Sequence, residues 1–264
     1  MKILDTSPVS YQLPLGDQLI EIDKSIGQSI SLSHTGNIFC IACGRKSKKS
    51  FSQGHCFPCF RRLASCDLCV MKPETCHHHL GTCRDENWAQ THCMTPHYVY
   101  LANSSGLKVG ITRENQLPTR WFDQGASQGI PMFKVSSRRY SGMVEHALKG
   151  FVSDRTDWRK MLKGGAEPLN LSALADELVG QAQSELERLN DLYPDIDLAR
   201  LDTEQKEIEF PVESYPEKVI SHNLDKSPVI EGRLDGIKGQ YLIFDSVVIN
   251  MRKYAGYELT FKPL

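Results

Sequence analysis

Long hydrophobic runs are missing from this 264-residue chain. No stretch approaches the roughly 18 apolar residues that a membrane-spanning helix needs. The first residues, Met1 to Thr6, also lack the basic and apolar regions of a signal peptide. We therefore expect a cytoplasmic protein with no membrane association.

Cysteine is absent from both ends of the chain, and all nine cysteines lie between Cys40 and Cys93. Thiols stay reduced in the cytosol, and an odd number of cysteines cannot all form disulfides within one chain. The clustering therefore predicts metal ligation and argues against a disulfide framework.

Signatures of several enzyme classes are also missing. The chain has no P-loop, no dinucleotide-binding fingerprint and no serine-hydrolase elbow. Hydrophobic residues make up 40% and charged residues 24%, which is typical of a globular protein. The length allows two or three small domains.

Acidic residues are sparse in the middle of the chain. Residues 40–163 contain 19 Lys or Arg against 9 Asp or Glu, whereas residues 164–264 contain 10 against 19 and residues 1–39 contain 2 against 4. A basic centre between acidic flanks predicts a face that binds a polyanion such as DNA or RNA, although solvated charges are the alternative. The candidate contacts are Arg45, Lys46, Lys48, Lys49, Arg61, Arg62, Arg113, Arg138 and Arg139.

Two Cys-x-x-Cys pairs predict a first zinc site. The pairs are Cys40 with Cys43 and Cys56 with Cys59, and twelve residues separate them. Each pair can present two thiolates to one ion, and a closed shell of four thiolates is typical of structural zinc. An iron–sulfur cluster or unrelated thiols are the alternatives.

A second group of thiols and imidazoles follows. Cys66 and Cys69 repeat the Cys-x-x-Cys spacing, and we expect a second zinc ion here, with an iron–sulfur cluster or buried free thiols as alternatives. The expected ligands are Cys66, Cys69, Cys76 and Cys83, with His77 or Cys93 as substitutes.

The next segment alternates strands and helices. Residues 97–102 and 107–112 predict a β-hairpin around a Ser- and Gly-containing turn. Residues 116–124 predict a helix, residues 131–137 a third strand, and residues 141–151 a second helix with an apolar stripe.

This order of elements, together with short motifs, resembles the GIY-YIG nuclease superfamily. Tyr98-Val-Tyr100 stands at the first motif and Lys108-Val-Gly110 at the second, while Arg120 and Glu145 lie on the two helices. The chain departs from the pattern where Tyr98 replaces the first Gly and Lys108 replaces the second Tyr. The chain as a whole also resembles an uncharacterised, DUF2797-like bacterial family of unknown function, through residues 108–112, 120–126 and 239–243.

The nuclease resemblance implies a metal-dependent phosphodiesterase site. Glu145 would hold Mg²⁺ or Mn²⁺ against the phosphate, and Arg120 would neutralise the charge that develops in the transition state. Tyr100 would help to take a proton from water, and Lys108 would lower the pKa of a nearby tyrosine. The implied catalytic residues are Tyr98, Tyr100, Lys108, Arg120 and Glu145.

We expect an α+β fold in which both ends of the chain close one antiparallel β platform or barrel around the other parts. The expected parts are residues 1–39, the first part of the platform; 40–95, a zinc-ribbon-like region; 96–165, a three-stranded GIY-YIG-like core; 166–205, a linker with an amphipathic helix over 171–192; and 206–264, the second part of the platform. The basic and aromatic residues Lys238, Tyr241, Arg252, Lys253 and Tyr254 could give this barrel a face for single strands.

The expected function is therefore that of a nucleic-acid-binding zinc protein with metal-dependent phosphodiester cleavage. The alternatives are a non-catalytic zinc-ribbon protein that binds DNA or RNA, and a zinc-stabilised adaptor between proteins.

Overall fold

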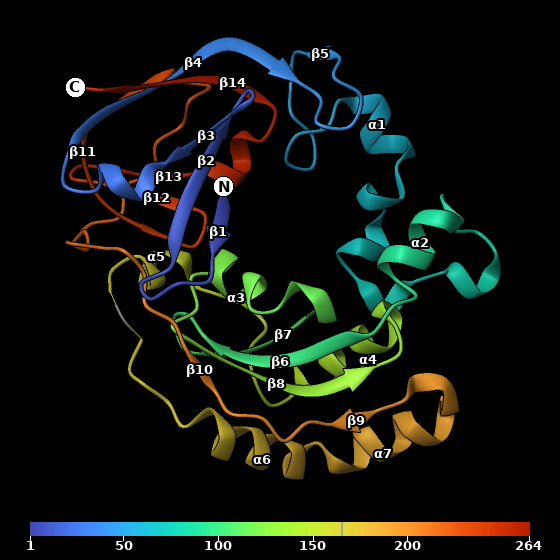
Figure 1. The fold of residues 1–264 in the computed structure, drawn as a ribbon. Coiled ribbons are helices and arrows are strands. Elements are labelled where there is room, and N and C mark those ends of the chain that lie inside the picture. The colour runs from blue at the N-terminus through green and yellow to red at the C-terminus, as the bar shows by residue number, and fades with distance from the viewer. Residues whose placement is uncertain (165) are drawn as a thin grey trace.

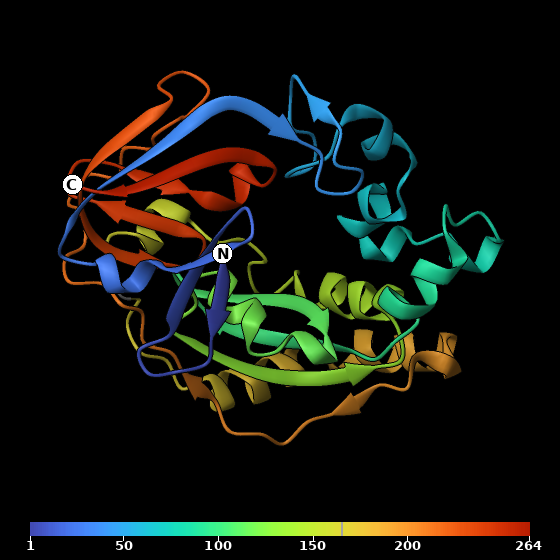
Figure 2. The same ribbon diagram turned by 45° about the horizontal axis from the view of Figure 1, so that its top comes forward.

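The computed structural model describes residues 1–164 and 166–264, so Gly165, at the end of the expected core segment, lies outside the described residues. The fold is a mixture of helices and antiparallel sheets (Figure 1), as expected for the α+β class. The platform, the cysteine-rich segment and the central sheet follow one another around an open arc (Figure 2).

The sheet of the platform joins the two ends of the chain. Strand β4 (Ser29–Phe39) pairs on one side with β11 (Val229–Lys238) and on the other with β14 (Tyr257–Pro263). The sheet also contains β5 (Lys46–Ser47), β12 (Tyr241–Phe244) and β13 (Val248–Asn250), and it curls into a half-barrel (Figure 2). As expected, one sheet combines strands from both parts of the chain, since β4 lies between two strands from the last part, but the strands within residues 2–21 form a sheet of their own.

A small sheet lies beside this half-barrel. It consists of β1 (Lys2–Leu4), β2 (Ser10–Leu15) and β3 (Gln18–Glu21) in sequential order. Alternation along β2 places Tyr11 and Leu13 in the apolar core of the platform.

The central sheet follows the cysteine-rich segment. Strand β6 (His97–Asn103) lies between β7 (Leu107–Arg113) and β8 (Gln128–Val135), and all pairs are antiparallel. The late strands β9 (Ala199–Arg200) and β10 (Lys206–Glu207) pair with β8.

Strand β6 separates two apolar cores, because its side chains alternate between the two faces of the sheet. Tyr100 and Ala102 join the core of the platform, together with helix α3 (Thr119–Asp123). Val99 and Leu101 join a second core on the other face. That second core is covered by α4 (Arg138–Leu148), α6 (Leu171–Gln181) and α7 (Gln183–Leu192).

The expected single helix over residues 171–192 is wrong in one respect, because the structure has two helices that meet at Ala182. Gly180 weakens the helix just before the break, since glycine has a low helix propensity. Helix α6 is capped by Asn170, whose side chain accepts a hydrogen bond from the backbone N–H of Ala173. Each of the two helices buries one apolar face in the second core, so both still cover that core despite the break.

The cysteine-rich segment is built from short helices and turns. It contains α1 (Phe57–Arg62), α2 (Glu86–His92) and 3₁₀ helices at Ala64–Cys66, Leu68–Val70, Pro73–Thr75 and His78–Leu80. A short helix α5 (Trp158–Met161) closes the central part. Within residues 1–164 and 166–264, no helix is both long and apolar enough to cross a membrane.

Two of the five residues expected to form a face for single strands are buried. Lys238 is only 2% exposed, and its ammonium group lies over the rings of Phe210 and Tyr215 at 5.6 and 5.3 Å. Burial lowers the pKa of Lys238 to about 8. Tyr254 is also buried, so two of the five proposed contacts cannot reach a ligand.

Candidate metal centre and nucleic-acid interface

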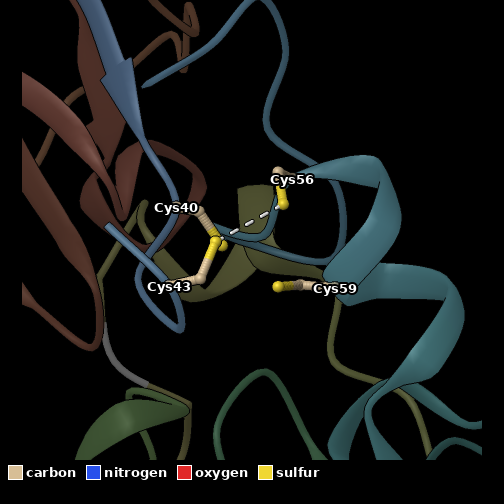
Figure 3. Close-up of side chains that lie close together, drawn as sticks. All are labelled: Cys40, Cys43, Cys56 and Cys59. Carbon is tan, nitrogen blue, oxygen red and sulfur yellow. Dashed lines mark hydrogen bonds between the residues drawn. The ribbon is translucent and has the colours of Figure 1, made fainter. Parts of the chain in front are cut away.

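Four cysteines come together where the platform meets the cysteine-rich segment (Figure 3). Cys40 and Cys43 follow the end of β4, while Cys56 precedes α1 and Cys59 lies within it. Their sulfur atoms all lie within 4.8 Å of one another, and the Sγ atoms of Cys43 and Cys56 are 3.8 Å apart.

A tight turn of the backbone at Gly44 shapes one side of this site. Gly44, at a positive φ of 69°, lets the chain reverse, and its N–H donates to the carbonyl of Cys40 at 2.8 Å. Burial alone would raise the pKa of the Cys40 thiol, but backbone N–H groups of Cys56, Ala42 and Cys43 lower it to about 6. Donors that stabilise a thiolate are what a metal ligand requires.

The geometry fits a zinc ion. A tetrahedron with Zn–S bonds of about 2.3 Å has S···S edges of about 3.8 Å, which equals the Cys43–Cys56 separation. Three buried cysteines form the apolar cluster here, and the partly buried side chain of Leu63 packs against it. An ion with four thiolates would be structural, and it would stabilise a segment that has almost no core of its own.

Residues 40–63, which contain the first four cysteines, have an exposed basic surface. Residues 40–63 contain six Lys or Arg and no acidic residue. All six are exposed, and no salt bridge is formed by any of them with the described residues. They are Arg45, Lys46, Lys48, Lys49, Arg61 and Arg62.

Aromatic rings lie on the same region. Phe51 packs against Phe57 and Phe60, with ring centroids 5.4 and 5.9 Å apart. Phe57 is 50% exposed, and the guanidinium of Arg61 lies 5.9 Å from its ring centre. Exposed rings beside unpaired cations are the two elements from which single-strand binding sites are built.

The other three expected nucleic-acid contacts lie elsewhere and are partly buried. Arg138 donates to the carbonyl of Val70 at 2.6 Å, and burial lowers the pKa of its guanidinium. Arg139 lies over the ring of Tyr193 at 5.7 Å. Arg113 is half-buried on β7. These three arginines therefore have structural environments that differ from the exposed cations of residues 40–63.

The second group of cysteines is only partly brought together as expected. Cys69, Cys76, Cys83 and Cys93 line one small cavity with His77. Cys66 is absent from this lining, and its sulfur lies 4.0 Å from the hydroxyl of Ser65. Burial and the charges of Asp67 and the neighbouring thiols raise the pKa of Cys69 to about 12. A separate close group is formed by one ligand atom each from Asp67, Cys69 and His77, which lie within 4.8 Å of one another.

Tyr100 is sealed inside the protein. Its ring is fully buried, stands edge-on to Trp121 at 6.0 Å, and its hydroxyl donates to Oε1 of Gln124 at 3.0 Å. Gly110 is the partner of Tyr100 on β7, and a Cβ there would lie 2.6 Å from the tyrosine hydroxyl. Burial raises the pKa of Tyr100, which the charge of Arg120 opposes.

Three charged residues gather near Tyr100 at the β7 edge of the sheet. Lys108 is 5% exposed, and its pKa falls to about 8 because of burial and the charge of Arg120. The carboxylate of Glu145 acts in the opposite direction on Lys108. Burial raises the pKa of Glu145 itself, and Lys149, at 3.5 Å, opposes that rise. Residues from β7, α3 and α4 thus influence one another electrostatically.

The remaining implied catalytic residue is engaged elsewhere. The hydroxyl of Tyr98 donates to Glu114 at 3.0 Å, and Lys134 contacts the same carboxylate at 2.7 Å. Asp154 was not selected from the sequence, yet it binds Lys149 at 3.0 Å beside Glu145. It lies in a loop without a motif, so only its proximity to Lys149 reveals it.

A polar cavity of about 960 Å³ lies elsewhere, beside the start of α6. Asp202, Glu204 and Glu207 line it, and no Lys or Arg does. Three carboxylates repel a phosphate, so this cavity does not suit a nucleic acid.

Comparisons with known proteins place the chain in a family without an assigned activity. No curated protein and no solved structure matches the chain, so the resemblance to GIY-YIG nucleases depends on the motifs alone. A family model does match residues 27–259, a span that includes β4, the cysteine-rich segment, the central sheet and the start of β14. The chain therefore belongs to the family described as a protein of unknown function (DUF2797).

Proposed function

We propose that this protein is a zinc-stabilised nucleic-acid-binding protein that contacts its ligand through residues 40–63. The observation that carries the proposal is the set of six exposed Lys and Arg residues in a segment without acidic residues. Cations that form no salt bridge with the described residues are free to replace the counterions of a phosphate backbone.

The aromatic side chains of the region support a single-stranded ligand. Phe57 offers an exposed face next to Arg61. Base stacking on such a ring contributes about 1–3 kcal/mol per base and tolerates any sequence. A duplex would offer only its phosphates, because its bases are already stacked.

Reversing the charge of Lys46, Lys48 and Lys49 together should test this interface. We expect the triple Lys→Glu variant to bind labelled single-stranded DNA or RNA at least tenfold more weakly. Each phosphate contact that is lost reduces the number of counterions released from the nucleic acid on binding. The dependence of log Kd on log salt should also become shallower. Fluorescence anisotropy at several salt concentrations measures both quantities.

The matched control reverses the same number of charges on the acidic C-terminal part. Lys218, Lys226 and Lys262 are exposed there, and their triple Lys→Glu variant has the same net charge. Equal weakening by both triple variants would show non-specific attraction and overturn the proposed interface. Absence of salt-dependent binding by the wild type would favour an adaptor between proteins.

A second candidate function is phosphodiester cleavage at the β7 edge. The observation that favours it is the mutual influence of Lys108, Arg120 and Glu145. Glu145, with Asp154 nearby, would hold Mg²⁺ or Mn²⁺, which would stabilise the developing charge on the phosphate. Tyr100 is buried and would support the site from beneath the surface.

Glu145→Gln tests this second function. If the wild type cleaves a labelled oligonucleotide with Mg²⁺ or Mn²⁺, the variant is expected to lose activity by a factor of about 100 or more, as when a transition-state partner is removed. Glu187→Gln, on the exposed face of α7, is the control and should keep full activity. Binding without cleavage by the wild type would leave only the non-catalytic function.

A further inference from the structure

Four turns of the chain bring four cysteines to one small cavity. Cys69, Cys76, Cys83 and Cys93 all line it, and its volume is about 10 Å³. That space holds about one water-sized sphere. The cavity is therefore about the size of a single atom, and four of the eleven residues that line it are cysteines.

The surrounding segment has no apolar core that could explain this arrangement. Residues 64–93, which the structure describes completely, contribute no member to any of the four apolar clusters. Several large apolar side chains point outward instead, since Leu68, Met71 and Leu80 are 64–80% exposed. Short segments without a core need a disulfide or a metal to hold one conformation.

We propose that Cys69, Cys76, Cys83 and Cys93 bind a second structural zinc ion, which holds residues 64–93 together. Four cysteine thiolates make a closed tetrahedral shell, and zinc is the common ion in such shells. This ligand set replaces Cys66 of the sequence-based expectation with Cys93, which was then a substitute.

Two other possible ligands lie next to the four thiols. Ligand atoms of Asp67, Cys69 and His77 lie within 4.8 Å of one another. The Asp67 carboxylate also contacts Arg84 at 2.6 Å and accepts the backbone N–H of Cys69 at 3.4 Å. Nδ1 of His77 lies 2.8 Å from the hydroxyl of Thr82, while its Nε2 lies 3.7 Å from Asp67. The four thiols are the proposed ligands, because four thiolates make the closed shell that is typical of structural zinc, and the His77→Ala variant tests this choice.

The metal would also fix the segment against helix α4. The backbone N–H of Arg138 donates a hydrogen bond to the carbonyl of Cys93 at 2.8 Å. The guanidinium group of Arg138 donates a second hydrogen bond to the carbonyl of Val70 at 2.6 Å. Pro73 packs closely on Gly142 in the same helix. Since α4 carries Glu145, the second zinc would determine where that carboxylate stands. The metal site itself does not depend on the proposed function.

The zinc content of the purified wild-type chain tests the proposal directly. We expect two zinc ions per chain by elemental analysis. Replacement by Co²⁺ should give the thiolate charge-transfer bands of two tetrahedral tetrathiolate sites. A single ion per chain, bound by the first site, would overturn the proposal without any variant.

Single substitutions then identify the ligands. Cys76→Ser and Cys83→Ser should each bind one ion fewer than the wild type, whereas Cys66→Ser and His77→Ala should keep two. Loss of an ion in Cys66→Ser or in His77→Ala, with two retained in Cys83→Ser, would overturn this ligand set. Co²⁺ spectra of the soluble variants distinguish a lost site from a misfolded chain, because the first site should keep its bands.

Discussion

Replacing Cys59 with serine is expected to remove one zinc ion per chain and to unfold residues 40–63. Cys59 is buried and is one of the three cysteines that form the local cluster. Structural zinc contributes on the order of 10 kcal/mol to the folding of such segments, and the apolar cluster here consists of three cysteines with the partly buried Leu63 packed against them. Elemental analysis and hydrogen exchange of residues 40–63 measure the two effects.

The platform should survive this change. Its core contains residues from β2, β4, β11 and β12 and does not include the four cysteines. Cys66→Ser is the matched control, because it removes a thiol that lies outside both groups of converging cysteines. An unchanged zinc content together with unchanged protection in Cys59→Ser would contradict the first metal site.

Gly142→Ala is expected to destabilise the protein and to loosen the cysteine-rich segment. A Cβ at Gly142 would lie 2.6 Å from Cβ of Pro73 and 2.7 Å from the backbone nitrogen of Glu74. Backbone atoms cannot rotate away, so the segment must move off α4. Overpacking of this kind costs about 1–3 kcal/mol, which a urea titration measures.

Gly180→Ala provides the control for this prediction. Gly180 also lies within a helix, but nothing stands within 4 Å of a Cβ there. Alanine should therefore stabilise the protein by up to about 1 kcal/mol through helix propensity alone. If the two variants change the free energy of unfolding in the same direction, the close approach of Pro73 to α4 is not as described.

Sequence patterns predicted the structure best where the geometry depends on a few neighbouring residues. Two Cys-x-x-Cys pairs predicted a site that the structure assembles, because each pair forms a short turn whose geometry is local. The hairpin of β6 and β7 was predicted for a similar reason, since alternation and a Ser-Gly turn act over a few residues.

Patterns failed where distant contacts compete with local preference. The resemblance to a nuclease implied that Tyr100 takes a proton from water, but pairing with Gly110 and packing on Trp121 bury its side chain completely. Basic residues of the barrel suggested a surface, yet Lys238 is covered by aromatic rings. Neither contact can be read from neighbouring residues.

Composition and short spacing were enough to predict a mixed α and β protein with a four-cysteine site and a basic centre. The three-dimensional structure was needed to find which thiols of the second group line one cavity, which cations remain exposed, and that β4 pairs with the C-terminal strands. These outcomes depend on contacts between residues far apart in the chain, and the physical reason is that burial is set by the whole fold.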